Sequence, residues 1–313
     1  MFKRILAVLL TAAMAATLFC GCDSNNKEDE KLQIVTAIFP AYDFARQIFG
    51  DTAEITLLLK PGTESHSYDP SAKDIVKINN CDLFIYNGGE SDAWVENILK
   101  GTDKINSLRM MDAVEAIEEE HSEGMTTEEE HEHEEETEYD EHIWTSPKNA
   151  AKILTSIKDK AKALFPENAD TYENNAQSYL DKINSLDRRF SELLAGESRY
   201  FVFGDRFPLL YFFKEYNLKY YAAFPGCNAE TEPSAQTIAF LTQKLGSDET
   251  VKTVFCIELS NHKLAQTLAD EHKLPVCEFH TCHNISADDF AAGESYVSLM
   301  ERNYNMLKTA LGK

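Results

Sequence analysis

The chain has 313 residues, of which 43% are hydrophobic, and it carries a formal net charge of -23. At roughly 100–200 residues per domain, this length predicts two domains with additional segments, and the apolar content is sufficient for packed cores. So acidic a chain would repel a phosphate backbone, which excludes nucleic acid as a partner but is compatible with cations as cargo.

The first 31 residues predict targeting and a tether. Lys3 and Arg4 precede an apolar run over 5–19, which is typical of a signal peptide and short for a membrane span. Gly21-Cys22 then matches a bacterial lipobox, so we expect cleavage before Cys22 and lipidation of that cysteine. An ordinary secretory signal with incidental cysteines is the alternative. The polar stretch 23–31 would be a flexible tether, which places the protein outside the cytoplasm, lipid-anchored to the outer face of the bacterial cell membrane.

The region 32–147 is expected to be an N-terminal lobe in which short strands alternate with helices. Such alternation predicts βαβ units and a parallel sheet. The expected strands are 32–37, 55–59 and 83–86, and the expected helices are 42–49, 71–79 and 93–99.

An acidic segment interrupts this lobe at 115–141. It contains fifteen Asp or Glu residues, no Lys or Arg, and the histidines His121, His131 and His133. Because such a block repels itself and has little to bury, it is predicted to be a disordered insertion. Its histidines either hold metal weakly and raise the local metal concentration, or the segment only solvates the surface.

Two linking helices are expected in 148–196, at 148–164 and 169–194, separated at Pro166. The second would be about 40 Å long, enough to bridge two lobes. The region 197–313 repeats the alternation, with strands at 200–203, 220–223, 253–257 and 275–279 and helices at 211–216, 234–245, 263–272 and 294–311. The expected fold is therefore α/β: two lobes, each a parallel sheet flanked by helices, joined by a long central helix.

Three histidine-bearing segments carry the chemistry. His66 follows an expected strand, His142 lies beside Trp144 after the acidic segment, and His280-Thr281-Cys282-His283 follows the last expected strand. Ligands bind beyond the carboxyl ends of parallel strands, and imidazole and thiolate suit zinc. Solvated surface histidines are the alternative for each segment, with an oxidised cysteine in the last.

Two of these segments, in this order and followed by a long helix, resemble a known family. They are Pro61-Gly62-x-x-x-His66-x-Tyr68-x-Pro70 and Asp140-Glu141-His142-x-Trp144-x-Ser146-Pro147. Over the chain from Leu32 onward, the pattern is similar to the ZnuA/TroA-like lipoproteins, the ABC-transporter solute-binding proteins for zinc and manganese. The acidic, histidine-bearing insertion resembles that of the zinc-specific members.

The resemblance implies four metal ligands, two from each lobe. His66 and His142 match the N-terminal pair, and His280 takes the position of the last ligand. The third position falls on Gly204, which has no side chain to coordinate with, so here the chain departs from the family pattern.

Substitutes for the third ligand are open. Asp205 is the nearest carboxylate, but it could instead pair with Arg206. Glu230 could bind metal or cap the following helix. Cys227 and Cys282 could form a disulfide near the cleft or offer thiolates.

The resemblance implies a monomeric receptor that captures a divalent transition metal between two lobes and delivers it to an ABC-transporter permease. Histidine-rich ligands favour zinc, whereas manganese remains possible if Asp205 and Glu230 both bind. A surface adhesion lipoprotein is one alternative and a zinc hydrolase another. The chain has no His-Glu-x-x-His, Gly-x-Ser-x-Gly or phosphate-binding Gly-rich loop, so we expect no enzymatic activity.

Overall fold

The computed structural model describes residues 31–63, 68–101, 104–126, 138–226 and 232–313. The chain divides into two units, residues 1–31 and 32–313. Of the first unit only Lys31 is described, so the expected signal peptide, the lipidation site Cys22 and most of the tether lie outside the described residues. Among the described residues, no helix has both the length and the apolar character needed to cross a bilayer.

The N-terminal half of the second unit forms a four-stranded parallel sheet in the order β2-β1-β3-β4. Strand β1 lies inside the sheet, with Ile34 paired to Ile55 on one side and to Leu83 on the other. The elements are β1 Leu32–Thr36, α2 Phe39–Phe49, β2 Ala53–Leu57, α3 Ala72–Asn80, β3 Leu83–Tyr86, α4 Ala93–Leu99 and β4 Ser107–Arg109.

The C-terminal half repeats this arrangement in a second parallel sheet, ordered β6-β5-β7-β8. In both sheets the chain leaves the first strand toward one neighbour and returns to the other, so each sheet has a switch point at which ligands bind. The elements are β5 Tyr200–Phe207, α7 Leu210–Glu215, β6 Lys219–Pro225, α8 Ala235–Ser247, β7 Val254–Ile257, α9 Lys263–His272, β8 Val276–Phe279, α10 Ala287–Ala291 and α11 Tyr296–Ala310.

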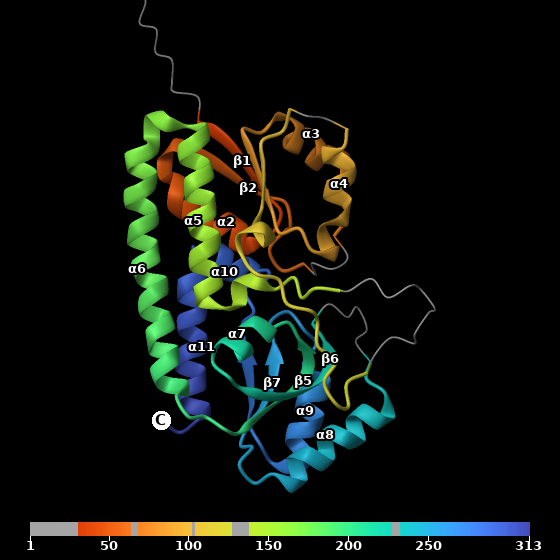
Figure 1. The fold of residues 1–313 in the computed structure, drawn as a ribbon. Coiled ribbons are helices and arrows are strands. Elements are labelled where there is room, and N and C mark those ends of the chain that lie inside the picture. The colour runs from red at the N-terminus through yellow and green to blue at the C-terminus, as the bar shows by residue number, and fades with distance from the viewer. Residues whose placement is uncertain (1–30, 64–67, 102–103, 127–137, 227–231) are drawn as a thin grey trace, which may run out of the picture. The chain divides into compact units, whose positions relative to one another are not determined.

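Two helices link the halves, α5 Pro147–Leu164 and α6 Ala169–Leu194. Ser146 caps α5 by accepting a hydrogen bond from the Asn149 N–H, and Pro147 occupies the first turn, where no N–H is needed. Helix α6 packs against α5 and α2 and, further along, against α11 (Figure 1). The side chains that it buries recur at helical spacing: Tyr172, Ala176, Tyr179, Ile183, Leu186, Phe190, Leu193 and Leu194.

The expected fold class is confirmed, with two parallel sheets and a long connecting helix. A single apolar cluster runs through both halves, from Ile34 in β1 to Phe279 at the end of β8. The two lobes are therefore joined by shared core as well as by α6, which favours small relative motions over wide opening.

The prediction of disorder for the acidic segment is wrong at both of its ends. The Glu119 N–H donates to the Glu138 carbonyl and the Asp140 N–H donates to the Ile117 carbonyl, both at 3.0 Å. Two apolar residues of this acidic segment, Ile117 and Met125, pack on the core. The average composition of the segment conceals them. The middle of the segment, 127–137 with His131 and His133, lies outside the described residues.

Candidate metal-binding site

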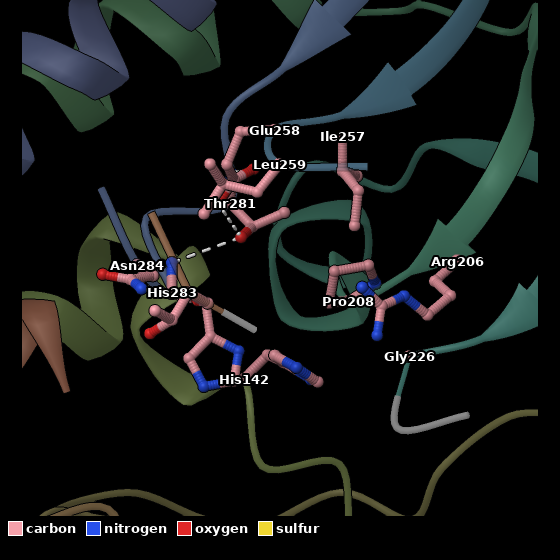
Figure 2. A pocket seen from close by; sticks show the side chains of 11 residues that line it. His142, Arg206, Pro208, Gly226, Ile257, Glu258, Leu259, Thr281, His283 and Asn284 are labelled. Atoms are coloured by element: carbon pink, nitrogen blue, oxygen red, sulfur yellow. Dashed lines mark hydrogen bonds between the residues drawn. The ribbon is translucent and has the colours of Figure 1, made fainter. Parts of the chain in front are cut away.

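A pocket that is open to solvent lies at the carboxyl ends of the strands. Both halves contribute. Thr63 follows β2 and His142 precedes α5, while the remaining lining residues lie at or just beyond the carboxyl ends of β5, β6, β7 and β8. This is the position expected for a ligand site in parallel sheets. The lining residues are Thr63, His142, Arg206, Pro208, Gly226, Ile257, Glu258, Leu259, Thr281, His283 and Asn284 (Figure 2).

His142 is fully buried and held by its own segment. Its backbone N–H donates to Asp140 Oδ1 at 2.7 Å, and its carbonyl accepts from the Thr145 hydroxyl at 2.8 Å. A short 3-10 helix, Ile143–Thr145, follows directly and leads into α5. These hydrogen bonds fix the backbone of His142 just before the N-terminus of α5, and so fix the position from which its imidazole extends.

Asp140 also sets the electrostatics of the ring. Its Oδ1 lies 3.2 Å from His142 Nδ1, so the carboxylate favours a proton on Nδ1 and directs the Nε2 lone pair to the other side of the ring. Burial is the largest single influence and acts to lower the pKa of His142. The charge of Asp140, its hydrogen bond to the ring and the charges of Glu141 and Glu119 together outweigh burial, so the pKa is raised. A carboxylate behind a histidine in this way is a recurrent support for metal ligands.

His283 approaches His142 from the C-terminal half. The two imidazole rings, both drawn in Figure 2, have centroids 5.2 Å apart and are nearly perpendicular. The Trp144 ring packs against both. The buried Trp144 donates from Nε1 to the Thr281 carbonyl at 2.9 Å, which ties the His142 segment to the His283 segment. Sequence reasoning identified this cluster but selected His280 within it.

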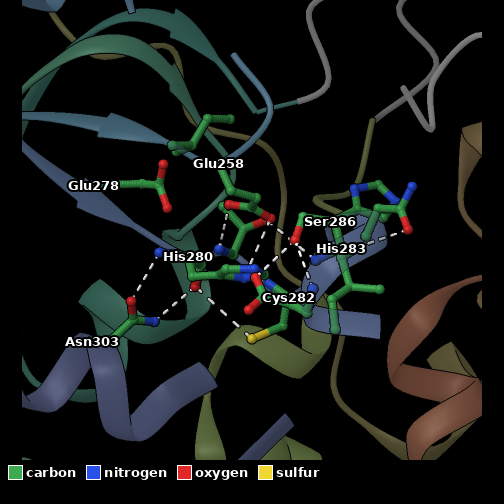
Figure 3. Close-up of polar contacts among 12 residues, drawn as sticks. Glu258, Glu278, His280, Cys282, His283, Ser286 and Asn303 are labelled. Carbon is green, nitrogen blue, oxygen red and sulfur yellow. Dashed lines mark hydrogen bonds and ion pairs between the residues drawn. The ribbon is translucent and has the colours of Figure 1, made fainter. Parts of the chain in front are cut away.

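His280 lies behind the pocket and does not line it. Its Nδ1 accepts the Cys282 N–H at 3.0 Å, and its backbone N–H and carbonyl are both bound by Asn303, at 2.8 and 2.7 Å (Figure 3). Cys282 has a positive φ of 62°, so the backbone turns sharply between the two histidines. That turn places His283, and not His280, beside His142.

Glu258, which sequence reasoning missed, is the carboxylate in the pocket wall. It follows β7 and accepts from the Thr281 N–H at 2.7 Å and the Thr281 hydroxyl at 2.5 Å. His280 Nδ1 lies 3.6 Å from the same carboxylate. An acid directly after a buried strand is the signal that could have identified it. Arg206 extends from β5 on another wall of the pocket (Figure 2).

The structure does not bring Asp205 to the pocket. Its carboxylate accepts from the Ser260 hydroxyl at 2.5 Å, from the Ile257 N–H at 3.2 Å and from the Arg206 N–H at 2.9 Å. Burial raises the pKa of Asp205, although these hydrogen bonds oppose the change. Asp205 therefore fastens the turn after β7, which carries Glu258.

Gly204 is explained by packing. A Cβ added there would lie 2.5 Å from the Cα of Ala265 in α9, closer than real Cβ atoms approach backbone. A side chain at this position would thus meet a helix before it could reach a metal.

The remaining expected ligands, His66 and Glu230, and Cys227 lie outside the described residues. Cys282 is fully buried and carries a free thiol, and burial raises its pKa well above the usual value, so a thiolate is disfavoured there. Helix α8 is capped by Ser234, whose side chain accepts the Thr237 N–H.

The donors that line the pocket fit zinc, since imidazole nitrogen and carboxylate oxygen are its usual protein ligands with cysteine. Within the described ranges, no group of three or more His, Cys, Asp or Glu side chains is placed to hold a metal ion. His142 and His283 are the imidazoles that the described residues bring to this pocket.

The profile of the ZnuA family, described as zinc-uptake complex component A, periplasmic, matches residues 34–310. The chain is 33% identical over 305 residues to the zinc-binding lipoprotein AdcA of Streptococcus pneumoniae strain R6, covering 96% of this chain and 60% of AdcA. It therefore spans about three fifths of that relative. It is 30% identical over 321 residues to the high-affinity zinc uptake system protein ZnuA of Bacillus subtilis strain 168, covering 99% of both.

Solved structures agree with the fold. The Zn(II)-bound ZnuA-like domain of Streptococcus pneumoniae AdcA superimposes with a TM-score of 0.74 at 31% identity, covering 90% of this chain and 100% of that domain. The laminin binding protein Lmb of Streptococcus agalactiae, described as bifunctional with adhesin and metal transporting activity, has a TM-score of 0.75 at 22% identity, covering 90% of this chain and 99% of Lmb. At that identity Lmb shares the fold.

Proposed function

The chain belongs to the ZnuA family of zinc-uptake complex components, and on that premise we propose that it is the extracytoplasmic receptor of an ABC importer. It captures Zn(II) between its two lobes and delivers the ion to a membrane permease. The observation that carries this proposal is that His142 and His283, from different halves of the chain, line one pocket. The protein binds and releases its substrate without chemical turnover.

The proposed ligands are His66, His142 and His283. His142 is supported by Asp140, His283 by its place in the pocket, and His66 by the Pro61–Pro70 motif alone. Neutral imidazoles favour zinc over manganese, which prefers oxygen donors. The fourth position is open to a carboxylate or a water, because Gly204 supplies nothing there and the Asp205 oxygens are committed elsewhere.

Metal titration of a soluble chain beginning at Asp23 tests this ligand set. The wild type should bind one Zn(II), and His66→Ala, His142→Ala and His283→Ala should each weaken binding by more than about 100-fold. His280→Ala is the comparison, and it should weaken binding much less than His283→Ala, because the His280 ring does not line the pocket. Tight binding by His283→Ala with weak binding by His280→Ala would return the ligand role to His280.

The anchor and the partner are proposed from the sequence and the family. Lipidation of Cys22 would hold the receptor beside the permease, with 23–31 as the tether, and a monomer suffices for delivery. Metabolic labelling with a fatty acid checks the anchor, since wild type should incorporate label and Cys22→Ala should not. Labelled Cys22→Ala would place the lipid on another residue.

The acidic segment is proposed to collect metal near the pocket. Its described end at Glu138 lies four residues before His142, and its other end is fastened to the C-terminal sheet by the Thr126 N–H, which donates to the Ala223 carbonyl at 2.8 Å. Deletion of 127–137 should slow zinc uptake under starvation and leave the affinity of the pocket unchanged. If the deletion variant takes up zinc as fast as wild type, the segment does not collect metal and only solvates the surface.

A further inference from the structure

A turn from the N-terminal half is held by the segment that follows His283. The turn Lys60–Thr63 leaves β2 and is closed by the Thr63 N–H and hydroxyl, which donate to the Lys60 carbonyl at 3.2 and 2.6 Å. Gly62, at a positive φ of 79°, donates its N–H to the Ile285 carbonyl at 2.7 Å. The two halves therefore share a backbone hydrogen bond at this edge of the pocket.

The side-chain amide of Asn284 makes the contact specific. Its Nδ2 donates to the Lys60 carbonyl at 2.9 Å and to the Thr63 carbonyl at 2.7 Å, one hydrogen for each end of the turn. Its Oδ1 accepts the Ile285 N–H at 2.8 Å. The residue is only 3% exposed, so water competes poorly for these bonds.

The contact is part of the pocket wall. Thr63, His283 and Asn284 all line the pocket, and Asn284 is the immediate neighbour of the proposed ligand His283. In the sequence, Thr63 stands three residues before His66. The side-chain amide of Asn284 thus joins the segment that carries the proposed ligand His283 to the turn that precedes the proposed ligand His66.

We propose that Asn284 is a positioning residue that latches the Lys60–Thr63 turn to the His283 segment and so slows the release of bound metal. This proposal rests on the proposed function, because it concerns the rate at which zinc leaves the same site. Release requires the walls of the pocket to part, and the latch must break for the turn to leave. Association is much less affected, since differences among related complexes fall mostly on dissociation.

Asn284→Asp tests the latch with almost no change of shape. The new carboxylate faces the Lys60 and Thr63 carbonyls with oxygen where the amide had donors. We expect zinc release into a chelator, followed by stopped flow, to become at least tenfold faster, with association changed less than threefold. Asn175→Asp is the matched control, because Asn175 Nδ2 donates to the Ile48 carbonyl at 3.0 Å between α6 and α2, elements that do not line the pocket.

The control should lose stability without faster release. Release from Asn284→Asp within twofold of wild type, or equally fast release from Asn175→Asp, overturns the latch while leaving the receptor intact. If Asn284→Asp does not fold, zinc release from the uncharged Asn284→Ser is measured in its place, with the same thresholds. If neither variant folds, the role of Asn284 is not limited to metal release and the proposal is overturned. Wild type that binds no zinc overturns the proposed function and the latch with it.

Discussion

Asp140 contacts His142 twice, through the backbone N–H at 2.7 Å and through Nδ1 of the ring at 3.2 Å, and both groups are buried. A single carboxylate oxygen therefore fixes the position of the residue and the tautomer of its ring. The pair stands two residues apart in the chain, so the geometry is local and does not depend on how the lobes meet.

Asp140→Asn should weaken zinc binding by about 10- to 100-fold, the usual cost of losing a carboxylate behind a ligating histidine. The amide can keep the backbone contact, but it no longer stabilises the ring proton with a negative charge. Calorimetric titration measures the change, and Asp181→Asn on the exposed face of α6 serves as the control. Equal affinities for Asp140→Asn and wild type would mean that the carboxylate does not orient the ligand.

Zinc affinity and the stability of the metal-free protein should respond to pH in opposite directions at His142. The pKa of His142 is raised in the folded state: burial lowers it, but Asp140 together with Glu141 and Glu119 more than compensates. Protonated His142 therefore stabilises the fold below the unfolded pKa of about 6.5, and this contribution is lost as pH rises through the folded pKa. Zinc needs the neutral ring, so affinity rises over that same window.

Competition with a chelator across pH 5 to 9 measures this effect. Affinity should begin to fall at a pH above 6.5 in wild type and at a lower pH in Asp140→Asn. Coincident profiles for the two proteins would contradict the assigned cause.

Much of the fold was accessible from hydrophobic periodicity. The bounds of α4, α6 and α9 coincide with those expected. Helix α6 follows the break at Pro166 and buries side chains at helical spacing along its length, and α9 buries Ala265, Leu268 and Ala269, whereas α4 buries Val95 alone. Strand β4 has only three residues and α10 only five, too short for a pattern to emerge. The ordered ends of the acidic segment depend on tertiary packing of Ile117 and Met125, which composition conceals.

The site was harder to predict, for a geometric reason. Which of His280 and His283 faces the pocket depends on the left-handed backbone at Cys282, a conformation that no residue type in the stretch announces. Likewise, sequence identifies Gly204 as a missing ligand, but only the approach of Ala265 explains why a glycine stands there.

Gly204→Ala should destabilise the fold by about 2–3 kcal/mol, the cost of forcing a methyl group against fixed backbone. Gly204→His should cost at least as much and should not tighten zinc binding, because the added side chain points at α9. Thermal unfolding measures both variants. Gly246→Ala in α8 is the control, since its nearest neighbour would be His272 Cε1 at an ordinary 3.5 Å. A stable Gly204→His with increased zinc affinity would contradict the packing argument.

Asp43→Asn should lower the stability of the protein without changing its zinc affinity, because Asp43 joins α2 to α6 and α11, away from the pocket. These contacts form the lobe junction. The fully buried Asp43 carboxylate accepts from the Tyr179 hydroxyl of α6 at 2.5 Å, the Tyr296 N–H of α11 at 2.9 Å and Arg46 Nε at 2.7 Å. Removing its charge should cost about 2–4 kcal/mol, discounted because Arg46 is partly exposed.

The matched control for this junction is Glu96→Gln, which breaks an ion pair whose side chains are both 73% exposed and should cost less than about 1 kcal/mol. Denaturant unfolding of the metal-free proteins measures both changes. Zinc affinity of Asp43→Asn should stay within about threefold of wild type, because α2, α6 and α11 do not line the pocket. A larger loss of affinity would show that the junction around Asp43 also sets the distance between the metal ligands.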